Sequence, residues 1–253
     1  MLVSLGGPVG SRPAGLEAAV ESAADLESFL RRAEVVDVRK EISGGRSRPW
    51  VITLALGEVR HRAMFKHFDY RRPQPQPHSY KYEIAAYELA KLLGVEIVPP
   101  VIEREIEGRK GSLQIFLEGC VSEQDRRRKK LEPPDPAAFA KALDGVRVFE
   151  SLVNDECLNY GDLLVHPEDW RLCRVDFSEA FAPLPNLPEG CPLTACSRKL
   201  YQGLLDLDAD KAGASLRPFL SSPEIKALLA RKDLLLAEIR RLIDDKGEAA
   251  VLF

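Results

Sequence analysis

Residues 60–94 read RHRAMFKHFDYRRPQPQPHSYKYEIAAYELAKLLG, and this stretch decides the fold. Its first part has the apolar pattern of a strand that ends at Lys66, and a proline-rich spacer follows. Its last part, 80–93, has the apolar spacing of an amphipathic helix, which Gly94 stops. We expect the apolar face of this helix to pack on the sheet and Glu83 to form an ion pair with Lys66.

Further strand patterns surround this stretch and predict a β-rich N-terminal half. A short helix pattern over 16–33 precedes them. The strand-like runs lie on either side of Gly44-Gly45, between the turn at Gly57 and Lys66, and within 95–106 and 112–119. We therefore expect about five antiparallel strands with one central helix.

The C-terminal half is mostly helical in pattern. A helix is expected over 136–154, and two short strands follow with a turn at Pro167-Glu168 between them. The whole chain after Pro192 is expected to be helical, including 226–245. The fold class is therefore α+β with two lobes. The expected domains are a flexible leader over 1–15, an N-lobe over 16–120 and a C-lobe over 121–253.

Charge and hydropathy exclude several classes of protein. The chain has 253 residues with 36 basic and 39 acidic side chains, which gives a net charge of −3. No positive field favours nucleic acid or an anionic membrane. No apolar run approaches the roughly 20 residues of a membrane helix, and the first residues lack the pattern of a secretory signal. We therefore expect a cytoplasmic protein without a membrane span.

The cysteines are odd in number and form no C-x-x-C pair. The pattern indicates neither a disulfide framework nor a zinc ribbon, so we expect thiols in the core or at the surface. The five positions are Cys120, Cys157, Cys173, Cys191 and Cys196.

Two segments of biased composition are expected at the surface. Proline and glutamine alternate over 73–77, which is typical of an extended spacer. The run RRRKK over 126–130 is expected to be a solvated face, with binding of phosphate or acidic groups as the alternative.

The N-terminal half contains the parts of a nucleotide pocket. A kinase-type phosphoryl transferase needs a glycine-containing hairpin over the phosphates, a strand lysine on the phosphates, and a helix glutamate that holds the lysine. Gly44 and Gly45, then Lys66, then Glu83 occur in this order, although an ordinary turn would also explain the glycines. Glu88 is a rival partner for the lysine, but it lies on a different face of the helix.

Two further groups are expected to contact the nucleotide. Arg46 follows the glycines and could add charge-assisted hydrogen bonds to phosphate. The strand pattern over 113–118 would form the hinge between the lobes. The backbone groups of Phe116, Leu117 and Glu118 would then pair with adenine.

The tract that includes SGGRSRPWVITL, RHRAMFKHFD, KYEIAAYELAKLLGVEIVPPVI and GSLQIFLEG resembles the HipA and phosphatidylinositol-kinase-like branch of the protein-kinase-like superfamily. The match spans about residues 35–205. It implies a two-lobed fold that binds ATP and Mg²⁺. Asp176, in the sequence Val-Asp-Phe-Ser, matches the metal-binding aspartate of the family, although an aspartate after a strand can also cap a turn.

The expected catalytic loop departs from the family pattern, in which an aspartate and four further residues precede an asparagine and an apolar strand. Here Asp162 occupies the asparagine position and Cys157 the aspartate position. Asp162 can still bind Mg²⁺, whereas a thiol needs an unusually low pKa to accept a proton. We therefore assign catalysis to Asp155 and Asp162, with Glu156 and Asn159 as alternatives to Asp155.

These residues support several functions. The first is an ATP-dependent phosphotransferase that acts on a protein or small-molecule acceptor, because phosphoryl transfer depends chiefly on positioning and electrostatics. A variant of it transfers AMP from an inverted ATP. The second is a pseudokinase that binds nucleotide, or nothing, and presents a surface to a partner. An unrelated α+β protein with accidental motifs is the remaining alternative.

Overall fold

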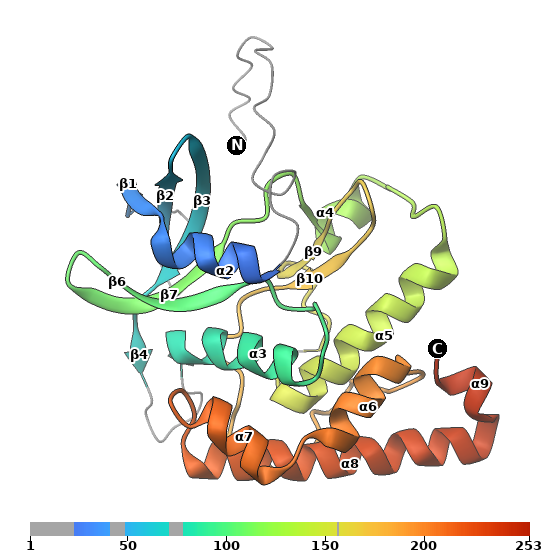
Figure 1. Ribbon diagram of the computed structural model, residues 1–253. Helices are drawn as coiled ribbons and strands as arrows, with labels where there is room; N and C mark the ends of the chain where they lie inside the picture. Colours follow the sequence, from blue (N-terminus) through green and yellow to red (C-terminus); the bar gives the residue numbers. More distant parts are fainter. Residues whose placement is uncertain (1–22, 41–48, 71–77, 156) are drawn as a thin grey trace.

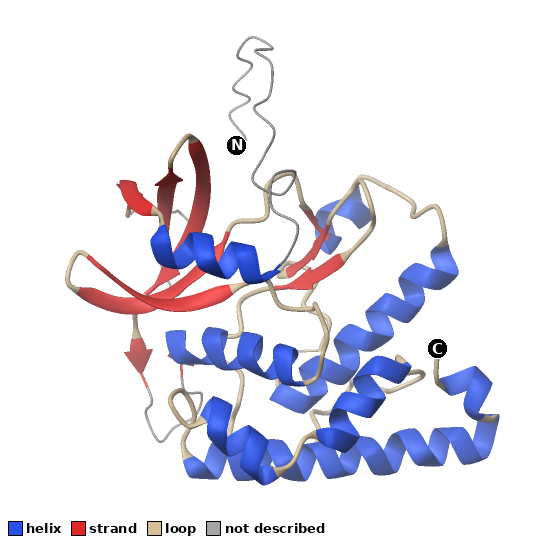
Figure 2. Cartoon of the chain, viewed as in Figure 1, coloured by secondary structure: helices blue, strands red, loops and turns tan. Residues whose placement is uncertain are grey.

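The computed structural model describes residues 23–40, 49–70, 78–155 and 157–253. The described chain is a two-lobed α+β structure, in which the larger sheet and the long C-terminal helices occupy different ends (Figures 1 and 2). This confirms the predicted fold class. The leader, the glycine-containing turn with Gly44, Gly45 and Arg46, and the proline-rich segment 73–77 lie outside the described residues.

An antiparallel five-stranded sheet, in the order β1-β2-β3-β7-β6, forms the N-terminal lobe of the described chain. Its strands are β1 (Glu34–Arg39), β2 (Trp50–Leu56), β3 (Val59–Lys66), β6 (Val101–Ile106) and β7 (Arg109–Ile115). Helix α2 (Ala23–Arg32) lies across the sheet and buries Phe29 and Leu30 against it (Figure 1). Alternate side chains of β2, from Trp50 to Leu54, face this core because successive strand residues point to opposite faces.

The end of β3 requires a glycine on the neighbouring strand. Lys66 pairs with Ser112 of β7, next to Gly111. A Cβ atom on Gly111 would lie 2.3 Å from the carbonyl oxygen of Lys66 and 2.7 Å from the ring of Phe65. A side chain at this position would therefore displace the end of β3, which carries the lysine.

Helix α3 (Tyr80–Leu92) lies between the sheet and the helical lobe (Figure 1). Ser79 caps its first turn by accepting a hydrogen bond from the backbone of Lys81. The helix contacts β6 and β7, which confirms the predicted packing on the sheet. Most of its buried side chains also belong to the core of the C-terminal helices, which was not predicted. A Cβ on Gly203 would lie 2.5 Å from the carbonyl oxygen of Leu93, so glycine permits this close packing.

Two short strands, β4 (Asp69–Tyr70) and β5 (His78–Ser79), pair with each other before α3.

The C-terminal lobe contains the remaining helices and a small sheet. Its elements are β8 (Val121–Ser122), α4 (Glu123–Arg128), α5 (Pro136–Val153), β9 (Leu163–Val165), β10 (Leu172–Arg174), α6 (Arg198–Asp206), α7 (Ala209–Leu216), α8 (Ser222–Lys246) and α9 (Glu248–Val251). The three strands form an antiparallel sheet in the order β10-β9-β8.

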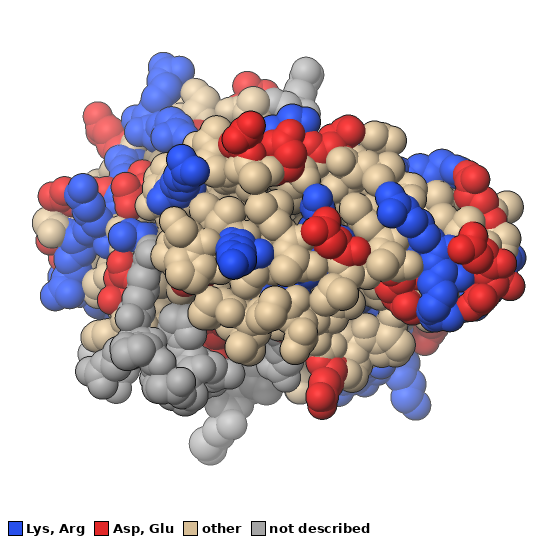
Figure 3. Space-filling view, turned by 90° about the horizontal axis from the view of Figure 1, so that it is seen from below, with Lys and Arg blue, Asp and Glu red and all other residues tan. Residues whose placement is uncertain are grey.

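Charged side chains on the underside of the molecule gather toward its ends. Figure 3 shows a middle that is mostly uncharged with a few isolated charges, and charges of both signs at the end where α8 finishes. There Arg241 pairs with Glu238 and Asp245. Within the described ranges, no helix is long and apolar enough to cross a bilayer.

The structure contradicts our expectation for the cysteines. Cys157 and Cys191 form a disulfide with their Cα atoms 5.6 Å apart. They are separated by 34 positions in the sequence, and the fold brings the loop after α5 next to the segment before α6. Spacing along the chain contains no sign of this proximity, so the sequence pattern missed it.

Candidate active site

Lys66 forms the centre of a cluster of charges between the two lobes. Its Nζ lies 2.5 Å from Glu83 Oε1 and 2.7 Å from Asp176 Oδ1. The lysine comes from the end of β3, the glutamate from the first turns of α3 and the aspartate from the chain after β10. Only 8% of Lys66 is exposed. The structure thus brings three residues identified from the sequence into one contact.

The segment that contains Asp176 is held in an unusual backbone conformation. Asp176 has a φ of 64°, which is uncommon for a residue with a side chain. Its Oδ1 accepts a hydrogen bond from Ser178 Oγ at 2.7 Å, and the backbone N–H of Phe177 donates to Glu83 Oε2 at 3.1 Å. The carbonyl of Ser178 accepts from the backbone of Ser79. These contacts aim the aspartate at Lys66.

The charges of the cluster shift one another's pKa values. Burial alone would lower the pKa of Lys66, but the carboxylates of Glu83 and Asp176 outweigh burial and raise it. Burial would raise the pKa of Asp176, but Lys66 and the hydrogen bond from Ser178 lower it to about 2. Burial and the nearby Asp176 charge raise the pKa of Glu83. Lys66 and Asp176 are therefore both charged at neutral pH.

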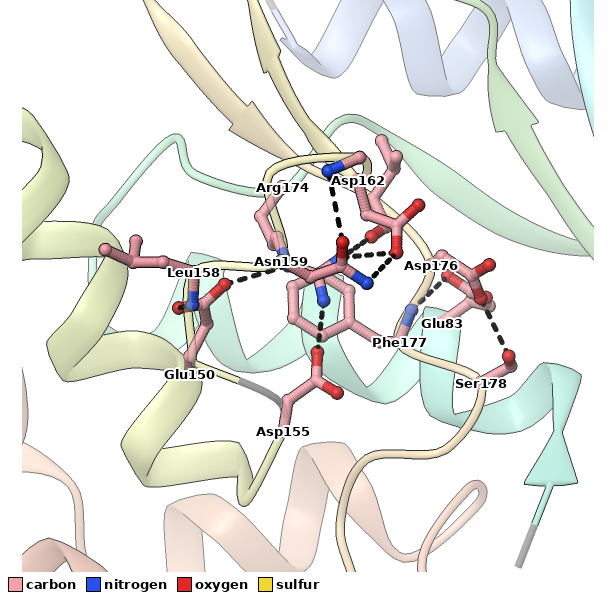
Figure 4. A network of polar contacts seen from close by, with 12 residues as sticks. Glu83, Glu150, Asp155, Leu158, Asn159, Asp162, Arg174, Asp176, Phe177 and Ser178 are labelled. Atoms are coloured by element: carbon pink, nitrogen blue, oxygen red, sulfur yellow. Dashed lines mark hydrogen bonds and ion pairs between the residues drawn. The ribbon is translucent and has the colours of Figure 1, made fainter. Parts of the chain in front are cut away.

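Arg174 organises the predicted catalytic loop from the adjacent strand β10. Only 1% of this residue is exposed. Its Nε lies 2.9 Å from Glu150 Oε1, its Nη2 lies 2.9 Å from Asp155 Oδ2, and its Nη1 lies 3.8 Å from Asp162 Oδ2. Figure 4 shows the arginine between these carboxylates, with Asp176 at the edge of the same network. One buried cation thus fixes both residues assigned to catalysis.

The two predicted catalytic aspartates have different environments. Asp155 has a side chain only 9% exposed and is bound by Arg174. Asp162, which immediately precedes β9, has a side chain 32% exposed and accepts a hydrogen bond from Asn159 Nδ2 at 2.7 Å. Cys157 is committed to its disulfide and offers no thiol. The residue at the aspartate position of the family pattern therefore cannot accept a proton.

Glu150 is a buried carboxyl group that sequence analysis missed. It lies in α5 with no exposed surface, and its Oε2 accepts a hydrogen bond from the backbone of Leu158 at 2.7 Å. Burial raises its pKa to about 7, against the opposing effect of Arg174. A period-two pattern could have indicated Arg174, which follows the buried Leu172 on the same face of a short strand. No pattern distinguished Glu150 within its helix.

Glu150→Gln should flatten the pH dependence of folding stability between about pH 4.5 and pH 7. The folded pKa of about 7 exceeds the ordinary value of 4.5, so the folded protein binds this proton more tightly than the unfolded chain does. The stabilising contribution is complete below pH 4.5 and is lost as pH rises to 7. Across this pH range, we expect the change in the free energy of unfolding to differ between the wild type and the variant by roughly 1–3 kcal/mol, measured by urea unfolding. Glu168→Gln, at an exposed turn, should keep the wild-type slope. An unchanged slope in Glu150→Gln would contradict the assignment.

The predicted hinge follows β7. The backbone N–H of Phe116 donates to the carbonyl of Arg62, so it is not available to a ligand. The guanidinium of Arg62 lies 4.1 Å from the ring centre of Phe116, and its Nε donates to Glu118 Oε1 at 2.7 Å. Within the described part of the chain, no hydrogen bond engages the backbone of Leu117 or Glu118. These two residues therefore present open backbone groups next to the sheet.

The oxygen ligands at the site fit a divalent cation of the Mg²⁺ type. Asp162 and Asp176 offer carboxylate oxygens, which Mg²⁺ prefers. Lys66 and Ser178 both bind Oδ1 of Asp176, and no hydrogen bond from a described residue reaches its Oδ2. The described residues contain no group of three or more ligands that could hold a metal alone. A Mg²⁺ ion held by two carboxylates is completed by phosphates and water.

Comparisons with known proteins identify the fold. No protein family model matches this sequence, and no curated protein is similar to it in sequence. Among solved structures, that of hydra Fam20 with sugar has a TM-score of 0.66 and 14% identity, over 93% of this chain and 94% of that one. The proinflammatory kinase CtkA of Helicobacter pylori has a TM-score of 0.52 and 13% identity, over 85% and 97%. At these identities the likeness shows a kinase-like fold.

Proposed function

We propose that this protein is an ATP- and Mg²⁺-dependent phosphotransferase of the HipA and phosphatidylinositol-kinase-like branch. The observation that carries the proposal is the contact of Lys66 with both Glu83 and Asp176. A strand lysine held by a helix glutamate, next to a metal-binding aspartate, is the arrangement that kinase-type phosphoryl transfer uses. In this proposal the lobes are residues 16–120 and 121–253, with the nucleotide between them.

Each residue of the cluster has a defined part in this proposal. Lys66 binds the phosphates, and Glu83 holds its side chain in place. Asp162 and Asp176 hold Mg²⁺, which neutralises charge on the phosphates when bound. The backbone of Leu117 and Glu118 pairs with adenine, since its polar groups are open within the described chain. Gly44, Gly45 and Arg46 are proposed to cover the phosphates.

The catalytic loop is proposed to act mainly by positioning. A carboxylate bound by a buried arginine is a weak base, because the arginine stabilises its charged form. Asp155 is in this state through Arg174. Phosphoryl transfer tolerates a weak base, since its transition state is loose and depends on orientation and electrostatics. We therefore assign Asp155 the orientation of an acceptor hydroxyl on a protein or small molecule.

Lys66→Met should weaken the binding of ATP about 10- to 100-fold, because it removes charged hydrogen bonds worth roughly 1.5–3 kcal/mol. The measurement is the rise in melting temperature with increasing Mg-ATP. At 100 times the dissociation constant, the ligand stabilises the folded state by about 2.7 kcal/mol. Lys110→Met, on the exposed face of β7, is the matched control and should bind as the wild type does. Equal titrations for the two variants would exclude Lys66 from the nucleotide site.

A transfer assay with γ-labelled and α-labelled ATP identifies the reaction. Transfer of the γ-label supports the phosphotransferase, and transfer of the α-label supports the AMP-transferring variant. The second candidate, a nucleotide-binding pseudokinase, is favoured by the binding of Asp155 to Arg174 and by the disulfide at Cys157. A melting shift with Mg-ATP but without label transfer would select it.

The disulfide also bears on the compartment in which the protein works. Disulfides persist in oxidising compartments and are rare in the cytosol. The Cys157–Cys191 bond therefore favours an oxidising compartment over the cytoplasm that composition suggests. Alkylation of thiols in protein taken from its own cells, followed by mass spectrometry, distinguishes the two. Alkylated Cys157 and Cys191 would point to the cytoplasm.

A further inference from the structure

Arg231 of α8 is a buried cation whose described partners are all carbonyl oxygens. It has no exposed surface. Its Nε donates to the carbonyl of Leu152 at 2.8 Å, and its Nη1 donates to Ala182 at 3.1 Å and to Leu184. Nη2 has no hydrogen-bond partner among the described residues. Burial lowers the pKa of Arg231 to about 10, so it is still charged at neutral pH.

Packing of the core alone does not explain an arginine at this position. Burying a charge costs several kcal/mol, and no carboxylate of a described residue offsets the cost here. An apolar side chain of similar volume would fill the same space at a lower cost. Toward the end of α8, by contrast, Arg241 lies at the surface and pairs with Glu238 and Asp245. Unlike an apolar side chain, the guanidinium of Arg231 can donate hydrogen bonds to two segments of the chain at once.

The two segments bound by Arg231 both border the proposed site. Leu152 lies in the last turn of α5, where carbonyls lack partners within the helix and a cation is favourable. Three residues later the chain reaches Asp155. Ala182 and Leu184 follow Asp176 by six and eight positions. Arg231 thus joins the start of the catalytic loop to the chain beyond the metal-binding aspartate.

Other contacts join the same two segments. The backbone N–H of Phe181 donates to the carbonyl of Val153 at 2.6 Å, and the Cys157–Cys191 disulfide links the loop to the far end of the second segment. Phe181 has a φ of 61°, a conformation that costs energy and needs support from its surroundings. Residues 183–186 between these links are exposed and belong to no helix or strand. Their position therefore depends on these links and on the hydrogen bond from Arg231 to the carbonyl of Leu184.

We propose that Arg231 is a positioning residue, which holds the chain after Asp176 against the end of α5 and so fixes the loop of Asp155 and Asp162. The inference rests on the proposed function for its effect on activity. Its effect on structure is independent of that function, because the two segments are joined whether or not the site transfers phosphate.

Hydrogen–deuterium exchange tests the structural part on the intact chain. In Arg231→Met, exchange should rise about tenfold or more in 152–162 and 177–190, because both segments lose a shared anchor. Arg231→Lys keeps the charge but has one donor group in place of the fork, so the rise should be smaller. Arg240→Met, an exposed position on the same helix, should leave both segments as in the wild type.

Turnover of Mg-ATP tests the functional part. The rate of release of γ-labelled phosphate should fall about tenfold in Arg231→Met, with KM for Mg-ATP changed by less than about twofold, because Arg231 positions the loop and contacts no proposed nucleotide-binding residue. Arg231→Lys should recover part of kcat. A purely structural role would not lower kcat while leaving KM for Mg-ATP nearly unchanged.

Several results would overturn the inference. Unchanged exchange in both segments of folded Arg231→Met would do so, as would a rise spread evenly over the chain. If Arg231→Met does not fold, the Arg231→Lys variant decides. Exchange in 152–162 and 177–190 that is the same as in the wild type would then contradict the positioning role of Arg231. Wild-type protein without turnover would remove the proposed function, while a local rise in exchange would still establish the contact between the segments.

Discussion

Asp176→Asn should lower the rate of phosphoryl transfer from Mg-ATP by about 10³-fold, since a metal ion at the phosphates contributes several kcal/mol to the transition state. Asparagine keeps the size of the side chain and can still accept the hydrogen bond from Ser178. It removes the negative charge that Lys66 stabilises and that Mg²⁺ requires. The measurement is transfer of γ-labelled phosphate at saturating ATP and Mg²⁺.

Asp169→Asn is the matched control for this variant. Asp169 lies between β9 and β10, near Asp176 in sequence, and pairs with Arg171 at the surface. We expect it to keep wild-type activity, because surface ion pairs contribute little. If Asp176→Asn retained more than a tenth of wild-type transfer, Asp176 would not be the metal ligand and the proposed site would be wrong.

Arg174→Met should destabilise the fold by about 3–5 kcal/mol, the usual cost of removing one partner from a buried ion pair. It leaves Glu150 and Asp155 buried without their cation. The free energy of unfolding in urea at pH 7 measures the loss. The loss should be smaller at pH 5, because Glu150, whose pKa is raised by burial, is then neutral and needs no cation.

Arg171→Met provides the comparison for Arg174→Met. Arg171 precedes β10, and its side chain is 66% exposed. Exposed substitutions of this kind change stability by less than about 0.5 kcal/mol. A similar loss in both variants, or a loss in Arg174→Met that grows as pH falls, would refute the account of Arg174 as the cation that neutralises the loop.

Much of the fold could be predicted because its elements follow local patterns. The strands around Gly57 and Lys66, the helix after Ser79 and the helix that begins at Pro136 all have clear periodicity and end signals. The packing of α3 was predicted only in part, because its contact with the sheet was expected and its contact with the C-terminal helices was not. Its apolar residues cover most of its circumference, so the pattern does not specify whether the sheet or the helices cover a given face.

Some residues of the candidate site could also be predicted from local patterns, and others could not. Lys66, Glu83 and Asp176 each stand at a recognisable place beside a strand or in a helix, and the structure brings them into contact. Their role in nucleotide binding stays a prediction. Arg174 and the Cys157–Cys191 pair depend on contacts between segments far apart in the chain, which periodicity does not encode.

The packing of α3 limits how the two lobes can move. On one side, Tyr82 donates a buried hydrogen bond to Glu224 of α8. On the other side, Tyr87 donates one to Glu27 of α2, so the helix is fastened to both lobes. A rigid-body opening of the lobes would have to break the polar contacts on one side of α3. An opening that moved the sheet away from the chain after β10 would also break the ion pair between Lys66 and Asp176.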